Sequence, residues 1–145
     1  MCLAGRGLRA RGKGERIALL SSWPPLPMVL VWPGQPVSTA EVFGALEKRH
    51  NPPLTEPPSI ASVSDVATWL GQRRNDLETP ARRVAPVIGT ALQALHASEN
   101  CLLARMSGSG SACFGLYADI DAARTAAQRL QRTSPDWWVA AALAR

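Results

Sequence analysis

Two short apolar runs joined by a serine- and glycine-rich loop constrain the fold of this chain more than any other feature. The runs span residues 101–104 and 112–117, and the loop between them reads Arg-Met-Ser-Gly-Ser-Gly-Ser. Because so short a loop leaves no room for a crossover, two strands at these positions must pair antiparallel. Small residues also let the backbone turn tightly and approach a second backbone or an anion. We therefore predict a hairpin at residues 101–118.

The loop of this hairpin has two interpretations. Three hydroxyls and several free N–H groups in one short loop can form a concave site for a phosphate. The loop is followed by a strand and not by Gly-Lys-Ser/Thr, so it is neither a Walker A loop nor a dinucleotide-binding fingerprint. A turn that binds nothing explains the same spacing, and the spacing alone favours this simpler interpretation.

The remaining elements complete an α+β order. A buried strand at 28–31 and a helix at about 39–48 precede a loop at 51–59 that contains four prolines. Further helices are predicted near 63–73, after residue 80 and at about 121–132, with a last strand at 137–143. Residues 1–20 are expected to be extended and irregular. The order predicts a two-layer sandwich, with a mainly antiparallel sheet and helices on one face.

Composition limits the classes of function. The 145 residues fit one domain, and Cys2, Cys101 and Cys113 include no Cys-x-x-Cys pair. We expect core thiols at Cys101 and Cys113, solvated side chains at His50 and His96, and no metal site. No apolar run reaches the roughly 18 residues of a membrane helix and no secretory signal is evident, so a cytoplasmic location is expected.

A net charge of +5 could indicate a nucleic-acid partner, but the positions of the charged residues argue against one. Five basic residues and one acid lie in residues 1–16, so the rest of the chain carries only +1. Its basic pairs, Arg73-Arg74 and Arg82-Arg83, fall in helical stretches that also carry acids, without interleaved aromatic residues. No nucleic-acid interface is therefore expected.

Four segments resemble, in order, one family of small-molecule kinases. Residues 28–46 are similar to the start of the C-terminal domain of the bacterial 4-diphosphocytidyl-2-C-methyl-D-erythritol kinases, which are GHMP kinases. Residues 75–80, Asn-Asp-Leu-Glu-Thr-Pro, resemble the start of the family's central helix. Residues 105–117 resemble its third motif, and residues 11–15 resemble its Gly-x-Gly-Glu segment. The resemblance covers almost the whole chain.

The resemblance implies a domain division and an activity. Residues 1–27 would be a remnant of the N-terminal kinase lobe with a linker, and residues 28–145 the ferredoxin-like C-terminal domain. The family transfers the γ-phosphoryl of ATP, with Mg²⁺, to the 2-hydroxyl of its cytidine-diphosphate methylerythritol substrate, a step of non-mevalonate isoprenoid biosynthesis. Its active site lies between two lobes.

Several parts of the family's machinery have no counterpart in this sequence. These are the main ATP phosphate loop, an N-terminal lysine and the catalytic Asp, whose Gly-Ala-Asp-Val-Pro segment would end just before Met1. We therefore expect no catalytic residue here, no turnover by this polypeptide alone, and either a missing first lobe as its partner or self-association. Trp32 is a further departure, because family members usually carry Asn before Pro-Gly.

The resemblance also implies roles for single residues. The loop residues would approach the nucleotide phosphates and buttress the main phosphate loop: Ser107, Gly108, Ser109, Gly110 and Ser111. Phe43 matches the aromatic residue that stacks on cytosine, although core packing would also explain it. Thr39 matches a hydroxyl near the methylerythritol unit, with a helix cap as its alternative. Asn75 and Asp76 are interpreted as helix-start residues.

Three classes of function stay open at this point. The chain is the substrate and phosphate half of such a kinase, a non-catalytic nucleotide-binding module or half of a split enzyme, or a basic nucleic-acid binder. The location of the charge argues against the third class.

Overall fold

A four-stranded antiparallel sheet forms the centre of the computed structural model, which describes residues 7–12, 14–20, 23–49 and 51–144. The strands lie in the order β4-β5-β3-β6. Their bounds are Leu26–Trp32 for β3, Cys101–Met106 for β4, Cys113–Tyr117 for β5 and Trp138–Ala144 for β6. The predicted hairpin is present as β4 and β5, and β3 pairs antiparallel with both β5 and β6.

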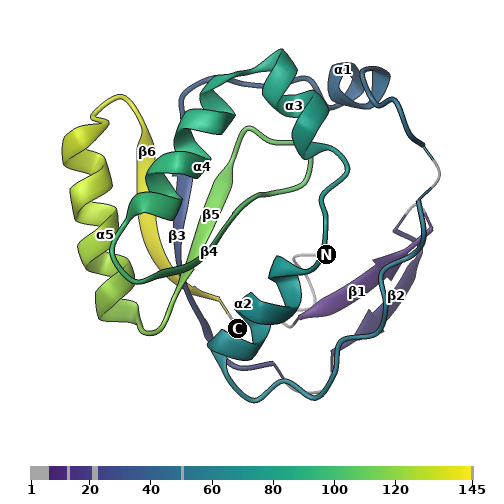
Figure 1. Cartoon of the computed structure of the whole chain (residues 1–145), viewed down its shortest axis with the longest axis horizontal. Helices are drawn as coiled ribbons and strands as arrows, with labels where there is room; N and C mark the ends of the chain where they lie inside the picture. Colours follow the sequence, from purple (N-terminus) through teal and green to yellow (C-terminus); the bar gives the residue numbers. More distant parts are fainter. Residues whose placement is uncertain (1–6, 13, 21–22, 50, 145) are drawn as a thin grey trace.

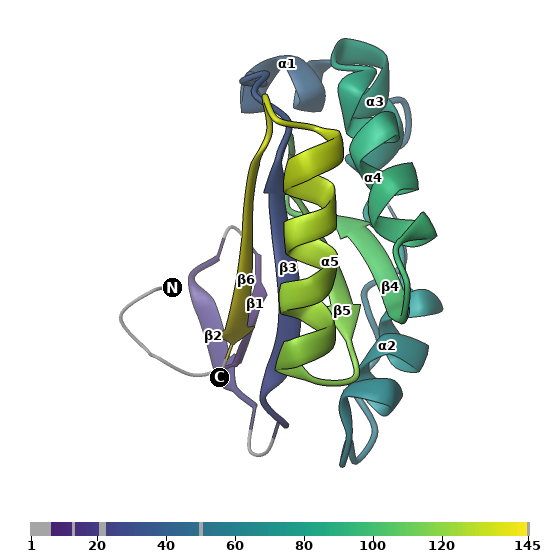
Figure 2. The ribbon, with the colours of Figure 1, turned by 90° about the vertical axis from the view of Figure 1, so that its left-hand side faces the viewer.

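Five helices surround the sheet in the described part of the chain. They are α1 (Thr39–Gly44), α2 (Val63–Gly71), α3 (Glu78–Val84), α4 (Val87–Ala97) and α5 (Ile120–Thr133). Figure 2 shows α4 and α5 lying along one face of the sheet. The element order from β3 to β6 and the strand order are those of a ferredoxin-like fold, so the predicted α+β sandwich is confirmed.

The main core lies between the sheet and α4 and α5. Alternation along β3 turns Val29 and Val31 into this core, where both are almost completely buried. Cys113 and Tyr117 face the same core from β5, which confirms Cys113 as a core thiol; Cys101 is half-buried.

A smaller core covers part of the opposite face. Leu116 is buried there against Val66 of α2, and Trp69 of the same helix meets Trp23 edge to face, with ring centroids 6.1 Å apart. Helix α2 therefore packs on the face that the two-layer prediction leaves uncovered, although the main helical layer is the one formed by α4 and α5.

The prediction of irregular backbone over residues 1–20 is wrong for the part that the structure describes. Strands β1 (Leu8–Arg11) and β2 (Arg16–Leu19) form an antiparallel hairpin. Each strand is only four residues long, and every residue of β2 is exposed, so the sequence gives only a weak signal for them. Ion pairs from Arg9 and Arg11 to Glu56 connect the hairpin to the Pro-rich loop.

Two of the predicted helices have different bounds. The helix predicted at 39–48 ends at Gly44, and the one after residue 80 is divided into α3 and α4. Pro86 marks the division, because proline has no N–H to donate and its ring clashes with the preceding turn. His96 is exposed at the end of α4, as predicted, whereas Cys2 and His50 lie outside the described residues.

Candidate functional site

The β4–β5 loop turns at two glycines that require a left-handed backbone. Gly108 has φ +56° and Gly110 has φ +88°, conformations that cost other residues energy. Within the loop, the Ser107 N–H donates to the Ala112 carbonyl and the Gly110 N–H donates to the Ser107 carbonyl. The N–H groups of Gly108 and Ser109 donate to no described residue, so the loop presents two available backbone donors.

The loop serines lie in three different environments. Ser111 is only 3% exposed and donates its hydroxyl to the Gln35 carbonyl, so it anchors the loop to the segment before α1. Ser109 Oγ lies 2.8 Å from Thr39 Oγ1. Ser107 is exposed. Ser107 and Ser109 are therefore the loop hydroxyls that a ligand can reach most directly.

Asn75 connects the segment before α3 to this loop. Its Nδ2 donates to the Gly108 carbonyl at 2.8 Å and to the Met106 carbonyl at 3.3 Å. Its Oδ1 accepts from the Leu77 N–H at 3.1 Å. Asn75 does begin the turn into α3, but sequence reasoning missed its contacts with the loop, which join residues more than 30 positions apart.

Phe43 lies on the exposed side of α1. Its side chain is 50% exposed, whereas the adjacent Val42 is fully buried, so core packing does not occupy the ring. It lines an open hollow of about 520 Å³. The lining residues come from α1, the Pro-rich loop, the α3 start and the β4–β5 loop: Phe43, Leu46, Arg49, Leu54, Arg74, Asn75, Asp76, Leu77 and Gly108. Figure 1 shows α1, α3 and the β4–β5 loop at the same end of the sheet.

Thr39 does not cap α1. The side chain of Ser38 accepts a hydrogen bond from the Glu41 N–H at 3.3 Å and fills that role. The Thr39 hydroxyl is directed instead to Ser109 across the top of the sheet. The structure thus brings Thr39, Phe43 and the serine–glycine loop together at one end of the domain.

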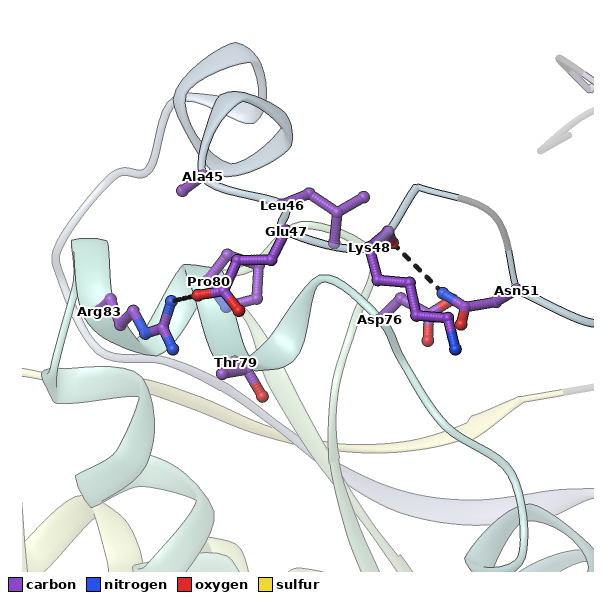
Figure 3. A pocket seen from close by; sticks show the side chains of 9 residues that line it. All are labelled: Ala45, Leu46, Glu47, Lys48, Asn51, Asp76, Thr79, Pro80 and Arg83. Atoms are coloured by element: carbon purple, nitrogen blue, oxygen red, sulfur yellow. Dashed lines mark hydrogen bonds and ion pairs between the residues drawn. The ribbon is translucent and has the colours of Figure 1, made fainter.

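A second hollow of about 260 Å³ lies beside the first and shares Asp76 with it. Figure 3 shows its lining, in which Arg83 of α3 pairs with Glu47. Hydrogen bonding and charge from Arg83 lower the pKa of the exposed Glu47 carboxyl. This pair joins α3 to the segment that follows α1.

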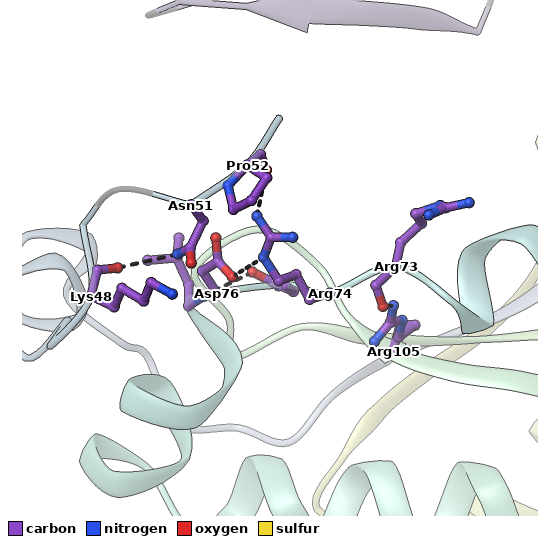
Figure 4. A network of polar contacts seen from close by, with 9 residues as sticks. Lys48, Asn51, Pro52, Arg73, Arg74, Asp76 and Arg105 are labelled. Atoms are coloured by element: carbon purple, nitrogen blue, oxygen red, sulfur yellow. Dashed lines mark hydrogen bonds and ion pairs between the residues drawn. The ribbon is translucent and has the colours of Figure 1, made fainter. Parts of the chain in front are cut away.

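Arg74 lines the first hollow and makes two hydrogen bonds there. Its Nε donates to Asp76 Oδ1 at 2.7 Å and its Nη2 donates to the Pro52 carbonyl at 2.6 Å, as Figure 4 shows. Asn51 adds a hydrogen bond to the Lys48 carbonyl at 3.3 Å. Sequence reasoning missed Arg49, Arg74 and Leu54 as lining residues, because all three lie in segments without helix or strand, which carry no periodicity that predicts their position.

The described residues contain no group of three or more His, Cys, Asp or Glu side chains arranged to hold a metal ion. None of the helices in the described ranges combines the length and apolar character needed to cross a membrane.

The fold and the site together define the class of this chain: a ferredoxin-like domain with a serine–glycine hairpin loop beside an exposed aromatic ring, as expected for the C-terminal domain of a small-molecule kinase. Residues 54–136 match the family described as GHMP kinases C terminal. The chain belongs to this family.

Relatives with established names support the same assignment. The chain is 47% identical over 146 residues to a 4-diphosphocytidyl-2-C-methyl-D-erythritol kinase of Dinoroseobacter shibae. It is 43% identical over 145 residues to a protein of the same name from Chelativorans sp.. Both matches cover 100% of this chain but only 51% and 49% of those proteins. The chain therefore spans about half the length of the curated relatives that it matches.

Solved structures agree at the level of the fold. A crystal structure of 4-(cytidine 5'-diphospho)-2C-methyl-D-erythritol kinase matches with a TM-score of 0.75 and 36% identity, covering 99% of this chain and 52% of that one. Homoserine kinase from Cytophaga hutchinsonii matches with a TM-score of 0.66 and 18% identity, covering 99% of this chain and 49% of that one. At this lower identity, the second likeness concerns the fold alone.

Proposed function

We propose that this chain is the C-terminal lobe of an ATP-dependent kinase that phosphorylates the 2-hydroxyl of 4-diphosphocytidyl-2-C-methyl-D-erythritol. The observation that carries the proposal is the hollow shared by Phe43 and Gly108. Its lining combines an exposed aromatic ring with a loop that has free amides. A ligand with a nucleobase and phosphates matches both features.

The side chains at this hollow support specific roles. The flat face of Phe43 suits stacking on cytosine. Arg49 lines the same hollow and supplies positive charge near the phosphates, whereas the charge of Arg74 is balanced by its ion pair with Asp76. Thr39 offers a hydroxyl to the sugar-alcohol part of the substrate and is held beside the loop by Ser109.

The serine–glycine loop supports the proposed use of ATP. Backbone N–H groups in a tight turn bind phosphate oxygens without a positively charged side chain. Gly108 and Ser109 supply such groups, and Ser111 fixes the loop from below through Gln35. The chain therefore fits a phosphate. We propose that Mg²⁺ accompanies the ATP.

The proposed partner is a first lobe that supplies the main phosphate loop and the catalytic groups, with residues 1–27 as its junction to the domain at 28–145. Exposed apolar side chains give such a partner surface to cover: Ile17, Leu19, Trp32 and Trp138. Trp32 and Trp138 lie directly opposite each other on β3 and β6, so the unusual Trp32 belongs to this exposed surface. We place the activity in the cytoplasm, where free thiols such as Cys113 stay reduced.

A lobe exchange tests this function. In the relative from Dinoroseobacter shibae, the half that matches this chain is replaced by residues 1–145, which gives a lobe-exchange enzyme. We expect it to form ADP only when the cytidylyl substrate is present, and we expect the 145-residue chain alone to form none. The unmodified relative and its isolated first half are the controls.

Two results would contradict the proposal. One is a folded lobe-exchange enzyme that shows no turnover while the unmodified relative is active. The other is turnover of the substrate by the 145-residue chain alone. A chain that binds cytidine nucleotides but never supports catalysis would instead indicate a non-catalytic binding module.

A further inference from the structure

Asn75 contacts the β4–β5 loop in a way that a helix-start residue does not require. Its amide uses both kinds of hydrogen-bonding atom, with Oδ1 accepting from Leu77 and Nδ2 donating to two carbonyls of the loop. The turn into α3 requires only the first of these bonds. The other two connect Asn75 to Met106 and Gly108, more than 30 residues further along the chain.

We propose that Asn75 is a positioning residue that sets the direction of the Ser109 N–H, so that this group faces a bound phosphoryl oxygen. The inference rests on the proposed function, because a phosphoryl group is the ligand that this N–H would meet. Asn75 acts through the loop backbone and is not proposed as a catalytic residue.

The geometry of the peptide group links the two atoms. The Gly108 carbonyl and the Ser109 N–H belong to one planar trans peptide and point in opposite directions. Because Asn75 Nδ2 holds the carbonyl at 2.8 Å, it also turns the Ser109 N–H away from the α3 segment. That N–H has no partner among the described residues, so it is available to an anion.

Glycine makes such a restraint necessary. Gly108 has φ +56° and no side chain, and a Cβ built on it would meet no atom within 4 Å. No side chain on Gly108 holds the Gly108–Ser109 peptide in place, and without a Cβ the ψ angle of Gly108, which sets the direction of this peptide, is less restricted than in other residues. After a flip, the carbonyl oxygen would face the site and repel a phosphate. The bond from Asn75 selects the orientation that attracts one.

Asn75 is itself held firmly enough to act in this way. Its own carbonyl accepts from the Glu78 N–H at 3.0 Å in the turn that begins α3. The preceding Arg74 is tied to Asp76 and to the Pro52 carbonyl. The bond from the Asn75 amide to the Met106 carbonyl is part-buried, whereas the shorter bond to the Gly108 carbonyl is exposed.

The test compares variants that keep the turn but lose the donor. In Asn75→Asp a carboxylate oxygen still accepts from Leu77, while the other oxygen replaces the donating nitrogen and repels two carbonyls. In Asn75→Ser the hydroxyl still accepts from Leu77 but is too short to reach the loop. Gln131→Glu is the matched control, because Gln131 Nε2 also bridges two carbonyls, those of Pro135 and Trp137 at 3.2 and 3.0 Å, outside the hollow.

The readout is the amide NMR spectrum of the 145-residue chain titrated with inorganic pyrophosphate. We expect the Gly108 and Ser109 resonances to shift in the natural chain and in Gln131→Glu, and pyrophosphate affinity to fall at least tenfold in both Asn75 variants at pH 7.5. In Asn75→Asp, affinity should recover toward pH 5, because a protonated carboxyl donates to the Gly108 carbonyl again. Its pKa should lie above the ordinary Asp value of about 3.9, since the adjacent carbonyls disfavour the charged form.

The resonances of β3, which contains none of the substituted residues, report whether each variant is folded. Equal pyrophosphate affinity in a folded Asn75→Ser chain and the natural chain would overturn the proposal, and so would a natural loop that does not respond to pyrophosphate. Failure of the kinase proposal is seen separately. In that case the loop would respond as described while the lobe-exchange enzyme stays inactive.

Discussion

The hydroxyl of Thr39 lies 2.8 Å from the hydroxyl of Ser109, although 70 positions separate the two residues. This contact joins the first turn of α1 to the loop between β4 and β5. It brings the residue expected to face the substrate to the loop expected to face the phosphates.

Thr39→Val should reduce function without reducing stability. Ser38 caps α1 and Thr39 is exposed, so we expect the free energy of unfolding to change by less than ~0.5 kcal/mol. In the lobe-exchange enzyme, kcat/KM for the cytidylyl substrate should fall about tenfold, equivalent to about 1.4 kcal/mol. Thr39→Ser keeps the hydroxyl and should stay near the unmodified value. A stability loss in Thr39→Val as large as that of Ser38→Ala, about 1 kcal/mol, would contradict this account.

Phe43→Ala should weaken the binding of CDP but have only a small effect on stability. Truncating a buried Phe typically costs 3–5 kcal/mol, but half of this ring is exposed, so we expect a loss of only about 1 kcal/mol. Calorimetric titration of the lobe-exchange enzyme with CDP should show affinity lowered about tenfold, because base stacking contributes roughly 1–3 kcal/mol. Leu102→Ala is the control, since Leu102 is similarly exposed but lies on β4 outside the hollow. Unchanged CDP affinity in Phe43→Ala would remove the ring from the site.

Alanine substitutions at three glycines should change the free energy of unfolding by different amounts, in a defined order. A Cβ at Gly110 would meet Met106 Sδ at 3.0 Å and Ile88 Cδ1 at 3.1 Å in a backbone with positive φ, so Gly110→Ala should cost more than ~2 kcal/mol. Gly108→Ala has positive φ but open space and should cost ~1–2 kcal/mol. Gly44→Ala lies in a helix and should be neutral or stabilising by up to ~1 kcal/mol. Urea unfolding gives the three values, and any other order would contradict the described loop conformation.

Stability should decrease in alkaline solution because two buried acids stay protonated in the folded chain. Burial raises the pKa of Tyr117 from 10.0 to about 12 and that of Cys113 from 9.0 to about 12. In the unfolded chain both groups ionise earlier, so unfolding releases protons and the free energy of unfolding falls as pH rises from about 9 to 12.

Tyr117→Phe isolates one of these groups. It should reduce the slope of stability against pH between pH 10 and 12 by about half, and it should cost about 1 kcal/mol at pH 7, because Tyr117 shares a 2.6 Å hydrogen bond with Ser98. Denaturant unfolding at several pH values measures both effects. An unchanged slope would show that Tyr117 does not contribute to the alkaline loss.

The sequence predicts the central sheet well, because its strands are marked by strong local signals. The loop at 107–111 forces β4 and β5 to pair, and alternation along β3 identifies Val29 and Val31 as core residues. The hairpin of β1 and β2 could not be predicted in the same way. Its strands are four residues long and β2 is wholly exposed, and the alternation of apolar and basic residues along β1 covers too few residues to mark a strand.

The sequence also predicts only some of the residues of the candidate site. The loop residues, Thr39 and Phe43 could be selected because they resemble a family motif. Asn75 and Arg74 could not, because their roles depend on contacts between segments far apart in the sequence. Only the folded chain shows that the amide of Asn75 reaches the loop or that Arg74 reaches the Pro52 carbonyl.

The kcat/KM of the lobe-exchange enzyme for 4-diphosphocytidyl-2-C-methyl-D-erythritol, followed as ATP-dependent phosphorylation of its 2-hydroxyl, tests the proposed kinase function. If residues 1–145 form the C-terminal lobe of such a kinase, this value should lie within about tenfold of the unmodified relative, and Phe43→Ala should lower it. A correctly folded lobe-exchange enzyme that leaves this substrate unphosphorylated would contradict the account.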